Sequence, residues 1–193
     1  MEKNTLIIVE GPQGAGKSTF TNYLRENLGS SDLHRLTGIK DKTKTGLTKV
    51  TKRFQRELDY IKQGTDASNP IMVYDRHFFT DEVYARLGYK EYSFEEQYQN
   101  FLKQLNEMEL NIFLIILYLK DESLYEERLA SRSKFEYQKF DIQNSINQQR
   151  EYLKLAGEIE KQSTNINVIR FANDNEEMFE TQMKDFFEKI QKL

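Results

Sequence analysis

Residues 11–18 read Gly11-Pro12-Gln13-Gly14-Ala15-Gly16-Lys17-Ser18 and directly follow the apolar run Leu6-Ile7-Ile8-Val9. This is a complete G-x-x-x-x-G-K-[ST] pattern, the phosphate-binding loop (P-loop), between a predicted buried strand and a predicted helix. The first N–H groups of that helix have no acceptor within the helix, so phosphate oxygens can accept from them. The positive end of the helix dipole strengthens this interaction. The motif in this setting predicts nucleotide binding.

Separate residues of the loop have separate expected roles. The glycines let the backbone turn tightly and approach the phosphates without an intervening Cβ. Lys17 is expected to neutralise the β- and γ-phosphates, and the Ser18 hydroxyl to bind Mg²⁺. The expected nucleotide-binding set is Gly11, Gly14, Ala15, Gly16, Lys17, Ser18 and Thr19.

The bulk composition excludes several classes of protein. A chain of 193 residues is expected to form a single domain, spanning residues 1–193. Its formal net charge of −3 argues against a stable nucleic-acid partner, because binding the phosphate backbone needs a basic surface. The chain has no cysteine, which excludes disulfides, thiolate zinc sites and cysteine nucleophiles. We expect no signal peptide or membrane span, and a cytoplasmic location.

The pattern of short apolar runs separated by helical periodicity predicts the fold. The runs are rich in branched and aromatic residues and show no polar alternation, which is typical of a parallel sheet covered on both faces. We therefore predict an α/β protein, with a three-layer α/β/α P-loop NTPase fold, a five-stranded parallel sheet and a short lid. The expected strands are residues 6–10, 71–75, 112–119 and 167–171, with a weaker one near 33–36. The expected helices are residues 18–28, 47–62, 122–132, 141–161 and 176–190, and one that follows a capping box at 93–96.

A second candidate feature is the pair Asp75-Arg76 at the end of the predicted strand 71–75. Its position places the pair at the same sheet edge as the P-loop. The Asp75 carboxylate can hold Mg²⁺-bound water or accept a proton, and Arg76 can bind a phosphate or phosphoryl acceptor. An ordinary surface salt bridge is the alternative. The neighbouring P-loop favours the functional interpretation, with Ser18 and Asp75 as metal ligands.

Arg128 and Arg132 are four residues apart and so share a helical face. They precede a polar, aromatic segment without clear periodicity, which we predict to be a lid around residues 132–141. Phosphoryl transfer needs positive charge near the transferred group and exclusion of water, and a lid with arginines supplies both. A solvated surface face explains the same spacing equally well.

The helix around Arg53, Phe54 and Arg56 lies where an acceptor should enter. Stacking of a base on the Phe54 ring is one interpretation. The other, slightly favoured by the pattern alone, is a surface helix whose phenylalanine packs in the core.

Taken in order, these motifs resemble those of the thymidylate kinase family and its deoxynucleoside kinase relatives. Residues 10–19 are similar to E-G-x-D-G-A-G-K-[ST]-T, and residues 75–84 to D-R-[YH]-x-x-S-x-x-A-Y. Residues 140–156 resemble the F-x-x-R-V-x-x-x-Y-x-x-L-A helix without its arginine and valine. The likeness covers roughly residues 5–156. It implies ATP and Mg²⁺ as cofactors, a place for Tyr84 in the acceptor site, and a homodimer.

The chain departs from the family in its acceptor motifs. Gln13 replaces the loop aspartate that helps to hold the acceptor sugar. The T-R-E-P-G segment, whose arginine binds the acceptor phosphate, has no equivalent around residues 36–42, where Lys40 is one of the lysines that could substitute. Ala15 stands where some members have an arginine, which implies that lid arginines supply the catalytic charge.

These observations predict transfer of the γ-phosphoryl group of ATP, with Mg²⁺, to a (deoxy)nucleoside monophosphate, with dTMP favoured by the resemblance. The expected catalytic residues are Lys17, Asp75, Arg128 and Arg132. The expected substrate-binding residues are Arg76, Phe54, Arg53, Arg56, Gln13 and Tyr84. Two alternatives stay open: a deoxynucleoside kinase acting on a free 5′-hydroxyl, with Asp75 as general base, and a nucleotide-binding switch or regulatory module.

Overall fold

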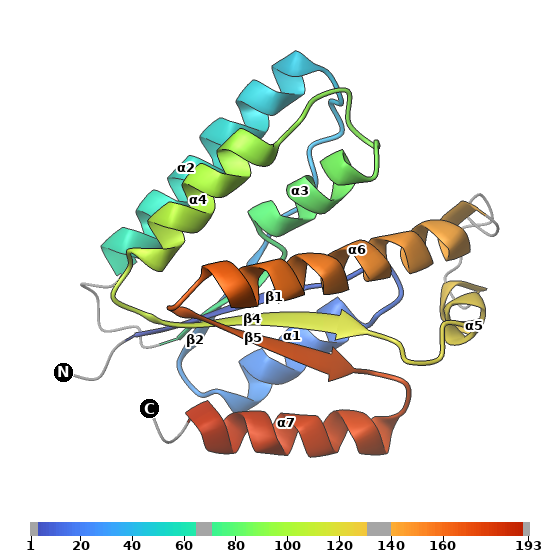
Figure 1. Cartoon of the computed structure of the whole chain (residues 1–193). Helices are drawn as coiled ribbons and strands as arrows, with labels where there is room; N and C mark the ends of the chain where they lie inside the picture. Colours follow the sequence, from blue (N-terminus) through green and yellow to red (C-terminus); the bar gives the residue numbers. More distant parts are fainter. Residues whose placement is uncertain (1–3, 65–70, 131–139, 191–193) are drawn as a thin grey trace.

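The computed structural model describes residues 4–64, 71–130 and 140–190 and contains one sheet (Figure 1). All strand pairings in it are parallel, in the order β2-β3-β1-β4-β5. The strands are β1 (Thr5–Glu10), β2 (Ser31–Arg35), β3 (Ile71–Asp75), β4 (Asn111–Tyr118) and β5 (Ile166–Ala172). The predicted five-stranded parallel sheet is confirmed, including its weakest member, β2.

Helices connect the strands and cover both faces of the sheet. They are α1 (Lys17–Asn27), α2 (Lys44–Gly64), α3 (Phe78–Arg86), α4 (Glu95–Asn106), α5 (Leu124–Ala130), α6 (Phe140–Gln162) and α7 (Glu176–Ile190). The sequence pattern missed α3 as a separate helix, because six of its residues are buried and it has little amphipathic contrast. Among the helices in the described ranges, none combines the length and hydropathy needed to cross a membrane.

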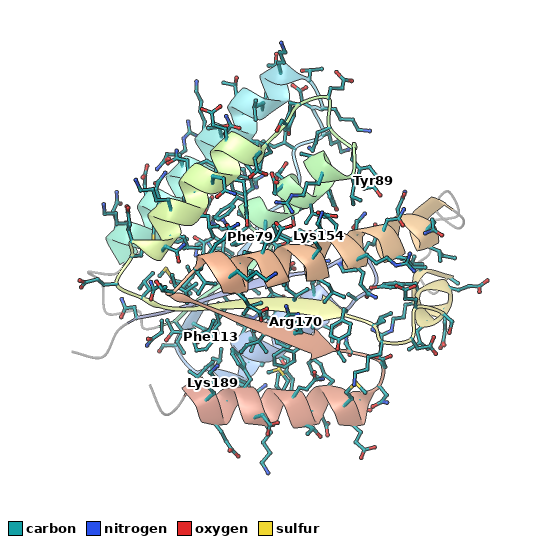
Figure 2. All side chains as sticks on the ribbon, viewed as in Figure 1. Phe79, Tyr89, Phe113, Lys154, Arg170 and Lys189 are labelled. Atoms are coloured by element: carbon teal, nitrogen blue, oxygen red, sulfur yellow. The ribbon has the colours of Figure 1, made fainter. Side chains whose placement is uncertain are left out.

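Alternate residues of each central strand belong to two different cores. Leu6 and Ile8 of β1 pack against the layer of α2, α3, α4 and α6, whereas Ile7 and Val9 pack against α1 and α7 (Figure 1). Figure 2 shows Phe113 of β4 on the side of α7, where its ring meets Phe186 at 5.4 Å. Because both faces are buried, the strands read as continuous apolar runs, and the predicted three-layer α/β/α arrangement is confirmed.

Strand order places the candidate residues at one edge of the sheet. In the register of β1 with β3, Val9 is the partner of Asp75, and in that of β2 with β3, Arg35 is the partner of Asp75. The carboxyl ends of these strands therefore lie beside the P-loop, which begins directly after β1. This edge is where ligands bind in open α/β sheets.

The predicted lid at residues 132–141, with Arg132 in it, lies outside the described residues except for the backbone at 140–141, which belongs to α6. The helix α5 that leads to it packs through Tyr125 and Leu129.

Packing of α1 on the sheet gives a stability prediction. The buried ring of Phe20 meets Phe171 of β5 at 5.0 Å and Phe179 of α7 at 5.6 Å. We expect Phe20→Ala to lower the free energy of unfolding by about 3–5 kcal/mol in urea titrations, since it leaves a cavity between three elements. Tyr60→Ala, at an exposed ring, is the control and should cost far less. A loss below about 1 kcal/mol for Phe20→Ala would contradict this packing.

Candidate active site

The P-loop turns sharply between β1 and α1. Gly11, Gly14 and Gly16 have φ values of 141°, 90° and 93°, a region that residues with a Cβ rarely adopt. A Cβ at Gly11 would also collide with the carbonyl oxygen of Leu117. Gly16 is the N-cap of α1, with no side-chain cap, so the first N–H groups of the helix are left for a ligand.

Lys17, Ser18 and Asp75 lie together at the start of α1. Lys17 is 6% exposed, and its Nζ donates to the carbonyl oxygens of Gly11 and Pro12, each at 2.7 Å. Ser18 Oγ donates to Asp75 Oδ2 at 3.3 Å, so the P-loop hydroxyl and the β3 carboxylate share one location. A hydroxyl and a carboxylate are hard oxygen donors that suit Mg²⁺. The described residues contain no group of three or more acidic or histidine side chains that could hold a metal.

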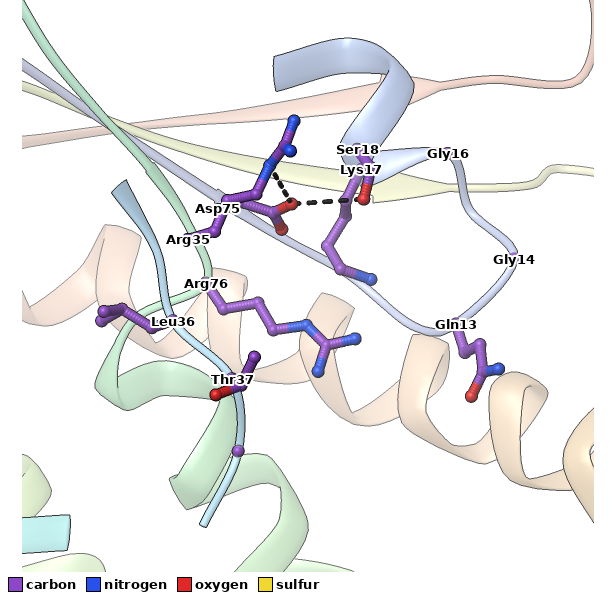
Figure 3. A pocket seen from close by; sticks show the side chains of 11 residues that line it. Gln13, Gly14, Gly16, Lys17, Ser18, Arg35, Leu36, Thr37, Asp75 and Arg76 are labelled. Atoms are coloured by element: carbon purple, nitrogen blue, oxygen red, sulfur yellow. Dashed lines mark hydrogen bonds and ion pairs between the residues drawn. The ribbon is translucent and has the colours of Figure 1, made fainter. Parts of the chain in front are cut away.

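A cleft of about 410 Å³ opens at this edge of the sheet (Figure 3). Its charged lining residues are Lys17, Arg35, Arg76 and Asp75, so cations outnumber the single carboxylate. The full lining is Gln13, Gly14, Gly16, Lys17, Ser18, Arg35, Leu36, Thr37, Gly38, Asp75 and Arg76. The cleft is therefore suited to anionic ligands, in a chain whose overall charge is negative.

Arg35 is a candidate functional residue that the sequence analysis missed. It ends β2, and its Nε lies 3.8 Å from Asp75 Oδ2, while its guanidinium donates to Asn22 of α1 (Figure 3). Its side chain is 47% exposed, and the residue lines the cleft. Residues 36–42, where the sequence resemblance places the acceptor-binding cation, begin just after it. The available signal was its position near the carboxyl end of the weak strand predicted around residues 33–36.

Arg76 adopts an unusual backbone conformation. Its φ of 74° makes it the one non-glycine residue with positive φ among the described residues, and its N–H donates to the Val9 carbonyl at 3.0 Å. Burial lowers the pKa of Arg76, but Tyr84, Tyr152, Glu10 and Asp75 raise it more, so the guanidinium stays charged. The sharp turn sends its side chain into the cleft (Figure 3). Such strained residues cluster at functional sites.

The Glu10 side chain holds the backbone turn at Arg76 through hydrogen bonds to residues that follow it. Its buried carboxylate accepts the His77 N–H and the Thr80 hydroxyl, each at 2.6 Å, and Thr80 Oγ1 lies 2.9 Å from the Tyr152 hydroxyl. Burial raises the pKa of Glu10 to about 7, although these hydrogen bonds and the charge of Arg76 oppose the rise. In the sequence, Glu10 stands out only as part of the motif at residues 10–19. Its raised pKa depends on tertiary burial, which the motif alone does not show.

The other predicted acceptor residues lie in different settings. Phe54 is 4% exposed and its ring contacts His77, at 5.4 Å, and Phe78, Phe94 and Phe101, so it packs as a core residue. Arg53 donates to the Thr37 carbonyl in the cleft wall, whereas Arg56 is exposed on α2. Tyr84 is half-buried, with its ring 5.7 Å from that of Tyr89. The packing of Phe54 therefore matches the alternative in which this phenylalanine belongs to the core.

Arg128 lies beside a second cavity, of about 470 Å³, on the other side of the P-loop. Its guanidinium donates to the carbonyl oxygens of Asn173 and Asp174. The cavity is lined by Gly16, Thr19, Tyr23, Arg128, Asn173, Asn175, Glu176, Phe179 and Glu180. Gly16 thus separates two neighbouring cavities. The structure places Arg128 near the loop, and its catalytic role stays a prediction.

The raised pKa of Glu10 gives a test of its burial. Unfolded, the carboxyl titrates near 4.5, and folded it titrates at about 7. The unfolded chain therefore loses its proton first, and the stability of the wild type should fall as pH rises from about 4.5 to about 7. We expect this loss to reach up to about 3 kcal/mol relative to Glu10→Gln, measured by urea unfolding at several pH values.

Glu82, whose pKa burial also raises to about 7, titrates in the same range in both proteins and cancels in the difference. Parallel stability curves for wild type and Glu10→Gln would contradict the buried, proton-retaining state of Glu10.

Comparison with known proteins supports the fold. Neither a protein-family model nor the sequence of a curated protein matches the chain. A solved structure of a deoxyadenosine kinase from M. mycoides, with the products dCMP and a flexible dCDP bound, matches with a TM-score of 0.60 and 16% sequence identity. The match covers 98% of this chain and 100% of that one. The chain therefore has an α/β/α fold like that of a P-loop kinase.

Proposed function

We propose that the protein is a kinase that transfers the γ-phosphoryl group of Mg²⁺-bound ATP to a (deoxy)nucleoside 5′-monophosphate. One observation carries the proposal: the cleft joins a P-loop lysine, a serine–aspartate pair and two guanidinium groups at one sheet edge. The P-loop accounts for the donor phosphates. The additional positive charge of Arg35 and Arg76 is explained by an acceptor that has a phosphate of its own.

On the donor side, the P-loop amides and Lys17 bind the β- and γ-phosphates. Lys17 exchanges its present carbonyl acceptors for phosphate oxygens, which form stronger, charge-assisted bonds. Ser18 and Asp75 would hold Mg²⁺, which would neutralise charge on the phosphates. The second cavity, where Tyr23 and Phe179 present aromatic surface, accommodates the donor base.

On the acceptor side, Arg35 and Arg76 bind the 5′-phosphate from two adjacent strand ends. Asp75, which contacts both Arg35 and Ser18, orients the attacking oxygen of the acceptor. Gln13 lines the same cleft and reaches the acceptor sugar. Arg128, which stays held by the carbonyl oxygens of Asn173 and Asp174, supplies positive charge to the transferred phosphoryl group. Catalysis arises from positioning and electrostatic stabilisation, without a covalent intermediate.

A deoxynucleoside kinase is the second candidate, because a protein with a similar structure is a deoxyadenosine kinase. In that case Asp75 acts as general base on a 5′-hydroxyl, and Arg35 has no acceptor phosphate to bind. dTMP is the acceptor that the sequence resemblance favours. A homodimer and a cytoplasmic location, both expected from the sequence, remain predictions.

Removing the P-loop ammonium tests the donor site. We expect Lys17→Ala to lower kcat at least about 100-fold, because a charge that stabilises the transferred phosphates is lost. The assay is ADP formation with Mg²⁺ and monophosphate acceptors. Lys52→Ala, on the exposed face of α2, removes the same charge and should leave the rate unchanged. Activity of Lys17→Ala near that of the wild type would refute the assignment of the loop.

Removing Arg35 tests the acceptor. We expect Arg35→Ala to raise the acceptor KM by about 10- to 100-fold, the value of one or two charge-assisted hydrogen bonds, with a much smaller change in the ATP KM. Arg25→Ala, at an exposed arginine of α1, is the charge-matched control. An acceptor KM that does not change in Arg35→Ala would exclude Arg35 from acceptor binding. Equal effects on both substrates would instead assign it to the donor side.

A further inference from the structure

The residue directly after β5, Asn173, connects two distant parts of the chain. Its N–H donates to the Tyr118 carbonyl at 2.9 Å, which continues the pairing of β4 with β5. Its side-chain Nδ2 donates to the carbonyl oxygen of Ala15 in the P-loop, also at 2.9 Å. The P-loop is therefore tied to the far side of the sheet by one side-chain amide.

The contact between Asn173 and the P-loop is close. A Cβ built on Gly16 would collide with the Asn173 amide nitrogen. Only a glycine therefore fits at the point where the loop passes this amide. Ala15 is fully buried, so an Ala15 carbonyl oxygen that loses this donor is poorly placed to find water instead. The amide thus braces the loop just before the N-terminus of α1.

The next residue extends the same connection to α5. The Asp174 carboxylate accepts the backbone N–H groups of Lys120, at 3.0 Å, and Asp121, at 2.7 Å, in the segment between β4 and α5. Arg128 of α5 in turn donates to the carbonyl oxygens of Asn173 and Asp174. The P-loop and the arginine-bearing helix are therefore both attached to residues 173–174.

We infer that Asn173 is a positioning residue for phosphoryl transfer, which holds the P-loop at a fixed distance from Arg128. The inference rests on the proposed function. The phosphates bound by the loop and the guanidinium that stabilises them must be aligned, and a displacement of about 1 Å can cost about 100-fold in rate. Asn173 maintains that alignment through the Ala15 carbonyl, without contacting the reacting atoms itself.

The test compares Asn173→Ala with a matched variant, Asn165→Ala. Asn165 Nδ2 also donates to a backbone carbonyl, that of Met108 at 2.8 Å, but at the opposite end of β5. For Asn173→Ala we expect a kcat lower by about 10- to 100-fold and a Kd for the ATP analogue AMP-PNP higher by about 10-fold. Asn165→Ala should lose similar thermal stability and keep both values. Equal kcat and Kd in Asn173→Ala and wild type would overturn the inference.

The coupling between Asn173 and Arg128 can be measured by combining substitutions of both residues. It would be absent if Asn173 only stabilised the fold. Arg128→Ala should lower kcat strongly in the wild type and only slightly in Asn173→Ala, because the guanidinium is already misaligned there. If the fold-changes in kcat of the two substitutions simply multiply in the double variant, the proposed connection is contradicted. If Asn173→Ala does not fold, Asn173→Ser, whose hydroxyl is too short to reach Ala15, replaces it with the same expected outcomes.

Failure of the proposed function can be told apart from failure of this inference. AMP-PNP binding needs no acceptor, so it can be measured even if no nucleotide accelerates ATP consumption by the wild type. Weakened binding in Asn173→Ala, with unchanged binding in Asn165→Ala, then still supports the brace on the P-loop. Unchanged binding in both variants rejects it.

Discussion

The start of α1 constrains the rest of the site. A helix that begins directly after a buried strand leaves its first N–H groups without acceptors, and here no side chain caps them. A glycine-rich turn exposes these groups to a ligand, but such a turn has little rigidity of its own. Gly11 packs against the Leu117 carbonyl, and Ala15 is held by Asn173. The neighbouring strand ends thus supply the rigidity that the loop lacks.

Local signals in the sequence were sufficient to predict the P-loop, the parallel sheet and the position of Asp75-Arg76 at the end of β3. They were insufficient to predict the positions of Arg35 beside Asp75 and of Asn173 beside the P-loop, which depend on the strand order β2-β3-β1-β4-β5. That order makes Arg35 the register partner of Asp75 and brings the end of β5 toward the P-loop. Phe54 likewise has helical spacing compatible with the core or the cleft, and only the rings around it distinguish them.

The charge of the cleft differs in sign from the net charge of the chain. The chain has a net charge of −3, yet the cleft is lined by Lys17, Arg35 and Arg76 against Asp75. Extended nucleic-acid binding would need a continuous basic surface, whereas a single small phosphorylated ligand needs only such a cleft. Beneath the cleft, burial raises the pKa of Glu10 to about 7, and the positive charge of Arg76 opposes that rise.

The identity of the acceptor separates the two kinase assignments, and a direct measurement distinguishes them. ATP-to-ADP conversion with Mg²⁺ should be followed against deoxynucleosides and their 5′-monophosphates, each tested separately, with the phosphorylated product identified. A site with Arg35 and Arg76 on an acceptor phosphate predicts nucleoside diphosphates as products and stimulation by monophosphates, above all dTMP. Stimulation by free nucleosides alone, with monophosphates as products, would contradict it.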